Sequence, residues 1–339
     1  MAVKESSAAP PRCSAGSAPL RIRGSARRTS SIDVCWPNGR AGNMLLVGRA
    51  RDIVTPRSAG PPTICREDAF KASLRPDRAI VAIEATPACP ALLRLVGERG
   101  GGGLRRVLEN VVPEQRRAAT PLYLILDDIS GASLVAGWAW SQWDPDWLAN
   151  GRAALKGFDL EKAFVSRTGI CSGFAPGSSA FDPGTDRAGT PAPDLRHPDD
   201  PDGWHEFTVQ DGVGMRRARR IDVWRDDVIV VDSAFQDSAS TPAGGRSVVH
   251  EYRLHLTADP ASLRVLSVEA EPRVLPFVEC TSAPANLTRL IGASLPELRD
   301  RVLAELRGTA GCTHLNDALR ALAQVPALLD RMTDLTMRI

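Results

Sequence analysis

A chain of 339 residues is long enough for two domains of ordinary size, and its 43% hydrophobic and 24% charged residues are typical of a globular protein. Its 42 basic and 40 acidic residues give a formal net charge of +2, without the basic excess of most nucleic-acid-binding proteins. No apolar run approaches the roughly 18 to 20 residues that cross a membrane. We therefore expect neither nucleic acid nor a membrane as a partner.

The N-terminal segment and the cysteines indicate a cellular compartment. Residues 1–26 are mostly Ala, Ser, Pro and Arg, lack the apolar core of a signal peptide, and are predicted to be a disordered tail. The seven cysteines are an odd number and widely scattered, which favours free thiols in a reducing cytoplasm. The high content of Ala, Arg, Asp and Pro is typical of a GC-rich bacterial genome. We expect a cytoplasmic bacterial protein.

The chain up to residue 150 is predicted to form a first half, beginning at residue 27. Its strands are expected near residues 31–34, 44–53 and 79–85, and its helices at 91–96 and 104–111. The apolar run 122–126 predicts a further buried strand, which leads into Asp127 and Asp128. Residues 151–214 follow as a connector, since much of this segment is rich in Pro, Gly and Asp.

Residues 215–331 are predicted to form a second half of four strands followed by three helices. The strands are expected at 221–224, 228–235, 248–257 and 263–271, and the helices around 287–291, 298–306 and 313–325. A cluster of arginines precedes the first strand and is interpreted as its solvated entry: Arg216, Arg217, Arg219 and Arg220.

The two halves share short motifs in the same order. The motif Arg27-Arg28-x-x-x-Ile32-Asp33-Val34 recurs 189 residues later as Arg216-Arg217-x-x-x-Ile221-Asp222-Val223. Further matches join 83–87 with 268–272, 94–97 with 289–292, and 107–108 with 302–303. Collinear matches of this kind indicate an internal duplication. The predicted fold class is α+β, with two related halves that each consist of an antiparallel sheet followed by packed helices.

A cysteine and histidine cluster is the strongest candidate site. Cys280 follows a predicted strand, and Cys312 and His314 lie at the start of a predicted helix. A helix N-terminus stabilises a thiolate, which is the form of cysteine that binds metal or attacks a carbonyl carbon. Two thiolates and an imidazole suit zinc or iron. Alternatively, Cys312 is a nucleophile with His314 as its base, acting on an acyl or thioester substrate.

The third interpretation assigns no chemistry to this cluster. Cys280 and Cys312 would then be small buried apolar residues, His314 would cap its helix, and the protein would be a non-catalytic binding module. At an offset of 195, the first-half counterparts of Cys312 and His314 are Arg117 and Ala119, so the first half lacks the cluster and is a degenerate copy.

The second half resembles a bacterial family known as domain of unknown function 2889. The resemblance is carried by Cys280 with Ala283-Pro284-x-Asn286-x-x-Arg289-Leu290-Ile291-Gly292, and by Gly311-Cys312-Thr313-His314-Leu315. It covers residues 27–60 and 215–330, and the family name implies no activity. Members of the family carry a further cysteine downstream of the last motif. This sequence has no cysteine after Cys312. Cys171, in the connector, could substitute for it as a fourth ligand beside Cys280, Cys312 and His314, and the sequence leaves open whether it joins them.

Overall fold

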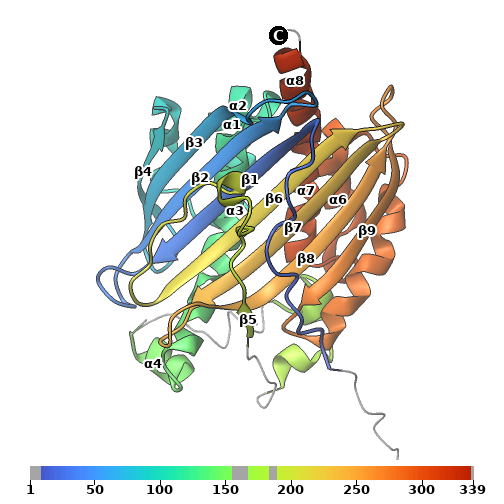
Figure 1. The fold of residues 1–339 in the computed structure, drawn as a ribbon. Helices are drawn as coiled ribbons and strands as arrows, with labels where there is room; N and C mark the ends of the chain where they lie inside the picture. Colours follow the sequence, from blue (N-terminus) through green and yellow to red (C-terminus); the bar gives the residue numbers. More distant parts are fainter. Residues whose placement is uncertain (1–8, 155–166, 183–188, 337–339) are drawn as a thin grey trace, which may run out of the picture.

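The computed structural model describes residues 9–154, 167–182 and 189–336, which build one antiparallel sheet with helices on one face (Figure 1). The hydrogen-bonded strand order is β4-β3-β2-β1-β6-β7-β8-β5, and β9 also pairs with β8. The first half contributes β1 Ser25–Cys35, β2 Met44–Thr55, β3 Thr63–Leu74 and β4 Ile80–Thr86. The remaining strands are β5 Thr190–Ala192, β6 Gly214–Arg225, β7 Ile229–Ser240, β8 Arg246–Ala258 and β9 Val265–Val274.

The pairing of β1 with β6 joins the two sets of strands into a single sheet. These strands pair antiparallel over their length, from Ser25 opposite Trp224 to Cys35 opposite Gly214. Nearly every residue of both strands is buried, because each face of the sheet is covered. The prediction of an α+β protein with antiparallel strands followed by helices is confirmed at this level.

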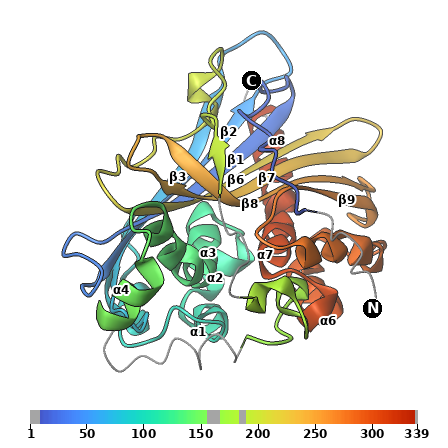
Figure 2. The same ribbon diagram turned by 90° about the horizontal axis from the view of Figure 1, so that it is seen from below.

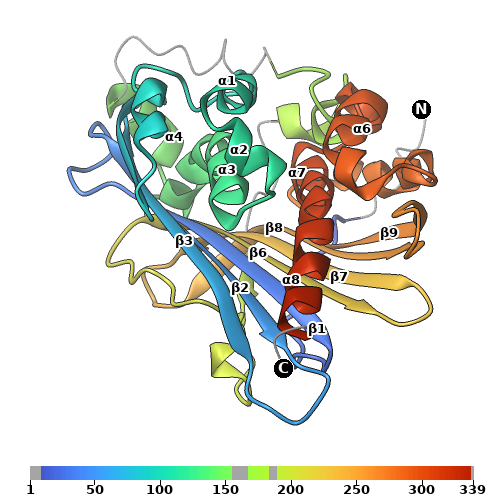
Figure 3. The ribbon, with the colours of Figure 1, turned by 90° about the horizontal axis from the view of Figure 1, so that it is seen from above.

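The helices cover one face of the sheet, as the views from below and above make clear (Figures 2 and 3). They begin with α1 Leu104–Val111, α2 Pro113–Arg117, α3 Pro121–Val135 and α4 Trp147–Ala154. They continue with α6 Leu298–Glu305, α7 Thr313–Ala321 and α8 Val325–Thr336, of which α8 packs on β1 and β6. Short 3-10 helices precede several of them, including η1 Pro90–Leu95, η2 Ala136–Gln142, η3 Ser172–Phe174 and η6 Val278–Leu290.

The strand predicted over residues 122–126 is wrong, because this segment forms the N-terminal part of helix α3. The Thr120 side chain accepts a hydrogen bond from Tyr123 N, and Pro121 occupies the first helical position, which together start the helix. A short apolar run cannot by itself distinguish a buried strand from a buried helix. The stretch Pro121–Gln142, formed by α3 and η2, is long and apolar enough to cross a membrane, but 78% of its apolar window is buried within the protein. It is a core helix.

The opposite face of the sheet is covered by segments that the sequence predicts to be tail and connector (Figure 1). Residues 9–24 do not behave as a disordered tail. Ser14 Oγ donates to Glu251 at 2.7 Å, and Ala18 N donates to Leu195 O of the connector at 2.8 Å. Residues 1–8 of the predicted tail lie outside the described residues. These contacts explain why the central strands are buried on this face as well.

The arginines of β6 are not a solvated strand entry, since all four are buried and paired with aspartates. Arg216 Nε donates to Asp33 at 2.6 Å on the tail-covered face, where Arg27 pairs with Asp222 in the same way. On the helix-covered face, Arg217 and Arg219 belong to a network with residues of α3, α6 and α7. Its other members include Arg105 of α1 together with Asp127, Asp128, Arg299, Asp317 and Arg320.

The network is stable only because each buried charge has a partner. Burial raises the pKa of Asp127, but Arg299, Arg320 and Arg105 outweigh this effect and hold that pKa well below its usual value. Removing one partner from a buried pair costs about 3 to 5 kcal/mol, because the other charge is left without compensation. The helices and the sheet are therefore joined by charge as well as by apolar packing.

Gly131 of α3 allows this network to form. A Cβ atom at this position would lie 1.8 Å from Arg217 Nη1 and 2.7 Å from Asp317 Oδ2. Replacing glycine by alanine inside a helix usually stabilises it by about 0.5 to 1 kcal/mol. Here the sign is reversed: we expect Gly131→Ala to lower the free energy of unfolding by about 1 to 3 kcal/mol in urea titrations.

The control for Gly131 is Gly137→Ala in η2, where an added Cβ meets no atom within 4 Å. This variant is expected to be as stable as the wild type or slightly more stable. Equal stability of the two alanine variants would contradict the close packing of α3 against Arg217.

His205 is buried on the tail-covered face and makes the stability of the protein depend on pH. Its ring nitrogens lie 2.9 Å from Thr29 Oγ1 and 2.8 Å from Ser31 Oγ. Burial, helped by Arg51 and Arg216, lowers the pKa of His205 to about 3. Because the unfolded chain binds a proton that the folded chain does not, stability is full above the unfolded pKa and falls as the pH drops below it.

We expect the wild type to lose roughly 2 kcal/mol through His205 alone between pH 7 and pH 5. In His205→Gln that part of the loss disappears, which urea unfolding at the two pH values measures directly. His197→Gln, at a partly exposed site in the same connector, serves as the control and retains the wild-type dependence. If the free energy of unfolding of His205→Gln falls between pH 7 and pH 5 as much as that of the wild type, His205 is not the cause of this pH dependence.

Candidate functional site

Three of the seven cysteines come together beside the N-terminus of α7. Cys171 directly precedes η3, Cys280 lies within η6, and Cys312 is the N-cap residue of α7. Their exposed fractions are 6%, 4% and 1%. Ser172 N donates to Gly311 O at 2.8 Å, which fixes the connector against the residue before Cys312. Cys171, the candidate fourth ligand from the sequence, therefore lies beside the cluster.

Gly173 allows the connector to approach the other two segments closely. A Cβ atom on Gly173 would lie 2.6 Å from Cys280 Sγ and 3.9 Å from Cys171 Sγ. Only glycine leaves room for the Cys280 thiol at this point. The backbone next to Cys171 is thus fitted to the sulfur of Cys280.

The thiols differ in their readiness to lose a proton. A hydrogen bond from Cys280 lowers the pKa of Cys312 well below its usual value despite burial, and His314 lowers it further. The same hydrogen bond, together with burial, raises the pKa of Cys280. Burial and the nearby Cys312 raise the pKa of Cys171 to about 11. Cys312 is therefore the thiol of the group that loses its proton most readily, as expected for a cysteine at a helix N-terminus.

Tyr252 of β8 lies under the thiols and is fully buried. Burial raises the pKa of its phenol well above the usual value, and Cys312, Cys280 and Cys171 raise it further. The hydroxyl therefore stays protonated and faces the sulfur atoms as a neutral group.

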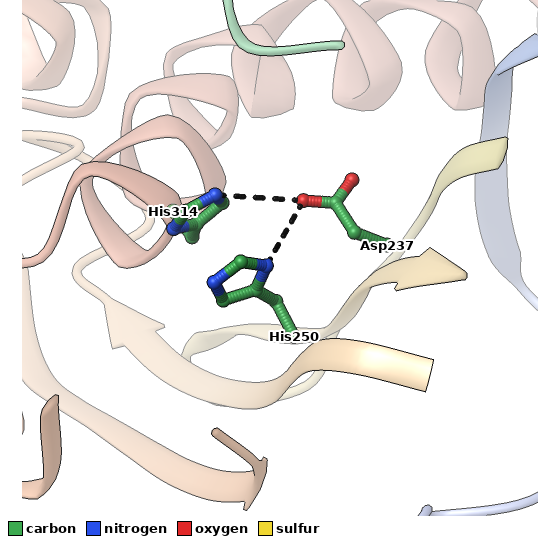
Figure 4. Close-up of side chains that lie close together, drawn as sticks. All are labelled: Asp237, His250 and His314. Atoms are coloured by element: carbon green, nitrogen blue, oxygen red, sulfur yellow. Dashed lines mark ion pairs between the residues drawn. The ribbon is translucent and has the colours of Figure 1, made fainter. Parts of the chain in front are cut away.

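His314 connects the thiols to a second group of ligand atoms. Its Nδ1 lies 4.0 Å from Cys312 Sγ, and its Nε2 lies 3.7 Å from Asp237 Oδ2. The ring of His250 stacks on the ring of His314, with centroids 3.5 Å apart and planes inclined by 18°. His250 Nδ1 lies 3.6 Å from the same oxygen of Asp237 (Figure 4). One ligand atom from each of Asp237, His250 and His314 thus falls within 4.8 Å of the others.

Asp237 is held in place by Arg217. Nε and Nη2 of Arg217 each donate to one carboxylate oxygen of Asp237 at 2.9 Å, and Nη1 donates to Asp317 of α7 at 3.0 Å. Burial opposes the charge on Arg217, but Asp237 and Asp317 raise its pKa above the ordinary value. A bidentate pair of this kind fixes the carboxylate in one orientation.

His250 is a neutral imidazole in this environment. Burial, followed by His314 and Arg217, lowers the pKa of His250 well below its usual value. A neutral ring carries a free lone pair on one nitrogen, which is the form that binds a metal ion.

The first set of strands contains the Arg–Asp pair without the histidines. Arg28 donates to Asp52 from Nε and Nη2 at 2.6 Å, as Arg217 does to Asp237. In the first set of strands, Asp52 lies opposite Arg66 on the neighbouring strand, next to a register shift. At the equivalent place in the second set, Asp237 lies opposite His250, also next to a register shift. The second half alone therefore carries the ligand-type side chains at these places.

The predicted first-half counterparts of Cys312 and His314 do not lie at a comparable helix start. Arg117 ends α2, and Ala119 follows it in a turn with φ 45°. The helix that begins at the corresponding place is α3, with Thr120 as its N-cap and Leu122 two residues later. Cys89 is the N-cap of η1 and is only partly buried. The prediction that the cysteine and histidine cluster is absent from the first half agrees with this arrangement.

Sequence reasoning missed Asp237 and His250. His250 lies in the predicted strand 248–257 and alternates in step with the buried residues Tyr252 and Leu254 of β8, whereas Asp237 lies beyond the predicted strand 228–235, in the part of β7 that the sequence analysis did not include. A histidine on the inward face of a strand is the signal that could have revealed His250. Asp237 offers no such signal, because its role depends on Arg217 of the neighbouring strand.

A family described as "Protein of unknown function (DUF2889)" matches residues 215–328. The second half is therefore similar to this family over residues 215–328. No curated protein and no solved structure matches the chain significantly. The matched range runs from β6 into α8, so it contains Asp237, His250, Cys280, Cys312 and His314, whereas Cys171 comes from the connector outside it.

Proposed function

We propose that this protein binds one zinc or iron ion through Cys171, Cys280, Cys312 and His314 Nδ1. The observation that carries the proposal is the convergence of three buried thiols from three segments that are far apart in the sequence. Soft thiolate ligands with one imidazole suit zinc and iron. The connector, η6 and α7 are then tied together by the ion.

The spacing of the ligand atoms supports this proposal. Around a tetrahedral zinc ion, a sulfur atom and a nitrogen atom are about 3.6 Å apart. Cys312 Sγ and His314 Nδ1, at 4.0 Å, need to move by only a few tenths of an ångström to meet that spacing. Cys280 and Cys312 shift the pKa of each other in opposite directions, as two neighbouring thiols do.

The surroundings of His314 are those of a metal ligand. A ligating histidine usually directs its other ring nitrogen at a carboxylate, which orients the ring. Here Nε2 faces Asp237, and Arg217 holds that carboxylate. With four protein ligands and almost no exposed sulfur, the proposed site is closed, and its ion would stabilise the fold.

A second candidate function is thiol chemistry at Cys312. It is favoured by the lowered pKa of Cys312 and by His314 and Asp237, which lie behind it in the order of a nucleophile, a base and an orienting acid. Cys312 would attack an acyl or thioester carbon. The 1% exposure of Cys312 weighs against this function, because a substrate must reach the sulfur.

We further infer that the two sets of strands arose by duplication, with halves 27–150 and 215–331 joined by connector 151–214. Gly97 and Gly292 both have positive φ, and each donates to the first residue of its strand, Ile80 or Val265, at 2.8 Å. Arg78 and Leu263 both have positive φ two residues before those strands. The seven cysteines are an odd number and widely scattered in the sequence, which favours a reducing, cytoplasmic location in a bacterium.

The proposal predicts that cobalt(II) binds to the thiolates and gives sulfur-to-cobalt charge-transfer absorption in the near ultraviolet. Cys280→Ser removes one ligand, so this absorption is expected to vanish or the affinity to fall at least roughly tenfold. Cys89→Ser is the matched control, because Cys89 lies at the start of the related 3-10 helix η1, away from the cluster.

The absence of charge-transfer absorption in reduced wild-type protein would refute the proposed thiolate site. In that case, rapid alkylation of Cys312 below pH 8 would favour the thiol enzyme. Slow alkylation would favour the non-catalytic module with a purely structural cluster.

A further inference from the structure

We propose a second metal site, formed by Asp237 Oδ2, His250 Nδ1 and His314 Nε2, which binds a divalent transition-metal ion. The three atoms belong to β7, β8 and α7 and face one another (Figure 4). This site stands on its own contacts, and it shares only His314 with the proposed thiolate site. When both sites are filled, His314 bridges the two ions and its ring proton is released to solvent.

The separations of these atoms are those of ligands around one ion. His250 Nδ1 and His314 Nε2 lie 3.6 Å and 3.7 Å from Asp237 Oδ2. Both distances are too long for hydrogen bonds, whose donor and acceptor atoms are about 2.7 to 3.2 Å apart. Tetrahedral ligand atoms about 2.0 to 2.1 Å from an ion are about 3.4 Å apart, so an ion fits among the three atoms.

His250 Nδ1 provides the second observation. It is a buried nitrogen that has no hydrogen-bond partner among the residues that the structure describes, and His250 is 6% exposed. Buried polar atoms without a partner are rare, since each one costs about 1 to 3 kcal/mol. An ion at this position would bind the lone pair of His250 Nδ1. It would also balance the negative charge of Asp237, because Arg217 shares its single positive charge between Asp237 and Asp317. Rotation of the stacked rings about their soft Cβ–Cγ bonds aims both lone pairs at the ion.

The first set of strands acts as an internal comparison. It repeats the Arg–Asp pair as Arg28 and Asp52, but has Arg66 where the second set has His250. Arg66 donates to Asp68 instead, at 2.8 Å. The Arg–Asp pair is therefore part of the scaffold, while the two histidines are specific to the second half. A scaffold role alone does not require them.

The ligand set indicates the class of ion and its chemistry. Two histidines and one carboxylate suit iron(II), manganese(II) or zinc(II) rather than a soft cation. Three protein ligands leave coordination positions open, unlike the four proposed at the thiolate site. The second site is thus the one able to bind water or a small anionic ligand.

The test is binding of cobalt(II) to metal-free, reduced full-length protein, with bound metal counted by elemental analysis and the thiolate band recorded on the same samples. The expected result is two ions per chain in the wild type and one in His250→Gln, with the charge-transfer band retained. Cys280→Ser should keep one ion and lose the band. The two variants thereby separate failure of this site from failure of the thiolate site.

His255→Gln is the matched control for His250→Gln. His255 lies on the same strand, and its Nδ1 is 3.7 Å from Asp232 Oδ2, but its side chain is 51% exposed. This variant should bind two ions. If His250→Gln binds as much cobalt as the wild type, the proposal of a second site is overturned, whether or not the thiolate-to-cobalt charge-transfer band is present. Circular dichroism of each variant establishes that it is folded.

Discussion

The buried pair between Arg217 and Asp237 is the interaction on which the rest of the second half depends. It joins neighbouring strands β6 and β7 through two hydrogen bonds of 2.9 Å, and the same guanidinium reaches Asp317 of α7. Through Asp317 the N-terminal part of α7 is held over the sheet. That position brings His314 above Asp237 and Cys312 beside Cys280. The Arg217 guanidinium thus links the sheet, the helix layer and the cluster of ligand-type side chains.

The same pair in the first half shows what the scaffold alone provides. Arg28 and Asp52 repeat its geometry, and Arg28 also reaches the helix layer through Ala119 O and Gln324. The helix above them begins with Thr120 and Leu122, which offer no thiol or imidazole. The first half therefore contributes one side of the common sheet and its core, while the candidate ligand side chains belong to the second half and to Cys171 of the connector.

The sequence predicts the part of this structure that depends on local pattern. The alternation of residues in the second half predicts its strands, and the motif around Cys312 and His314 predicts a helix start with a cysteine at its N-terminus. The sequence does not predict which residues far apart in the chain pair with one another. The arginines of β6 look solvated in the sequence, because their aspartate partners lie far away in the chain or on other elements. His250 and Asp237 were missed for the same reason, and 122–126 because an apolar run fits a strand or a helix.

In the proposed site, thiolates and an imidazole bind one ion beside α7. X-ray absorption at the metal edge, on protein purified anaerobically without a histidine tag, tests this proposal most directly. We expect ligand atoms of two kinds around the metal ion, with sulfur at about 2.3 Å and nitrogen or oxygen at about 2.0 Å. A shell of nitrogen and oxygen alone, or protein that takes up no zinc or iron, would contradict the proposal.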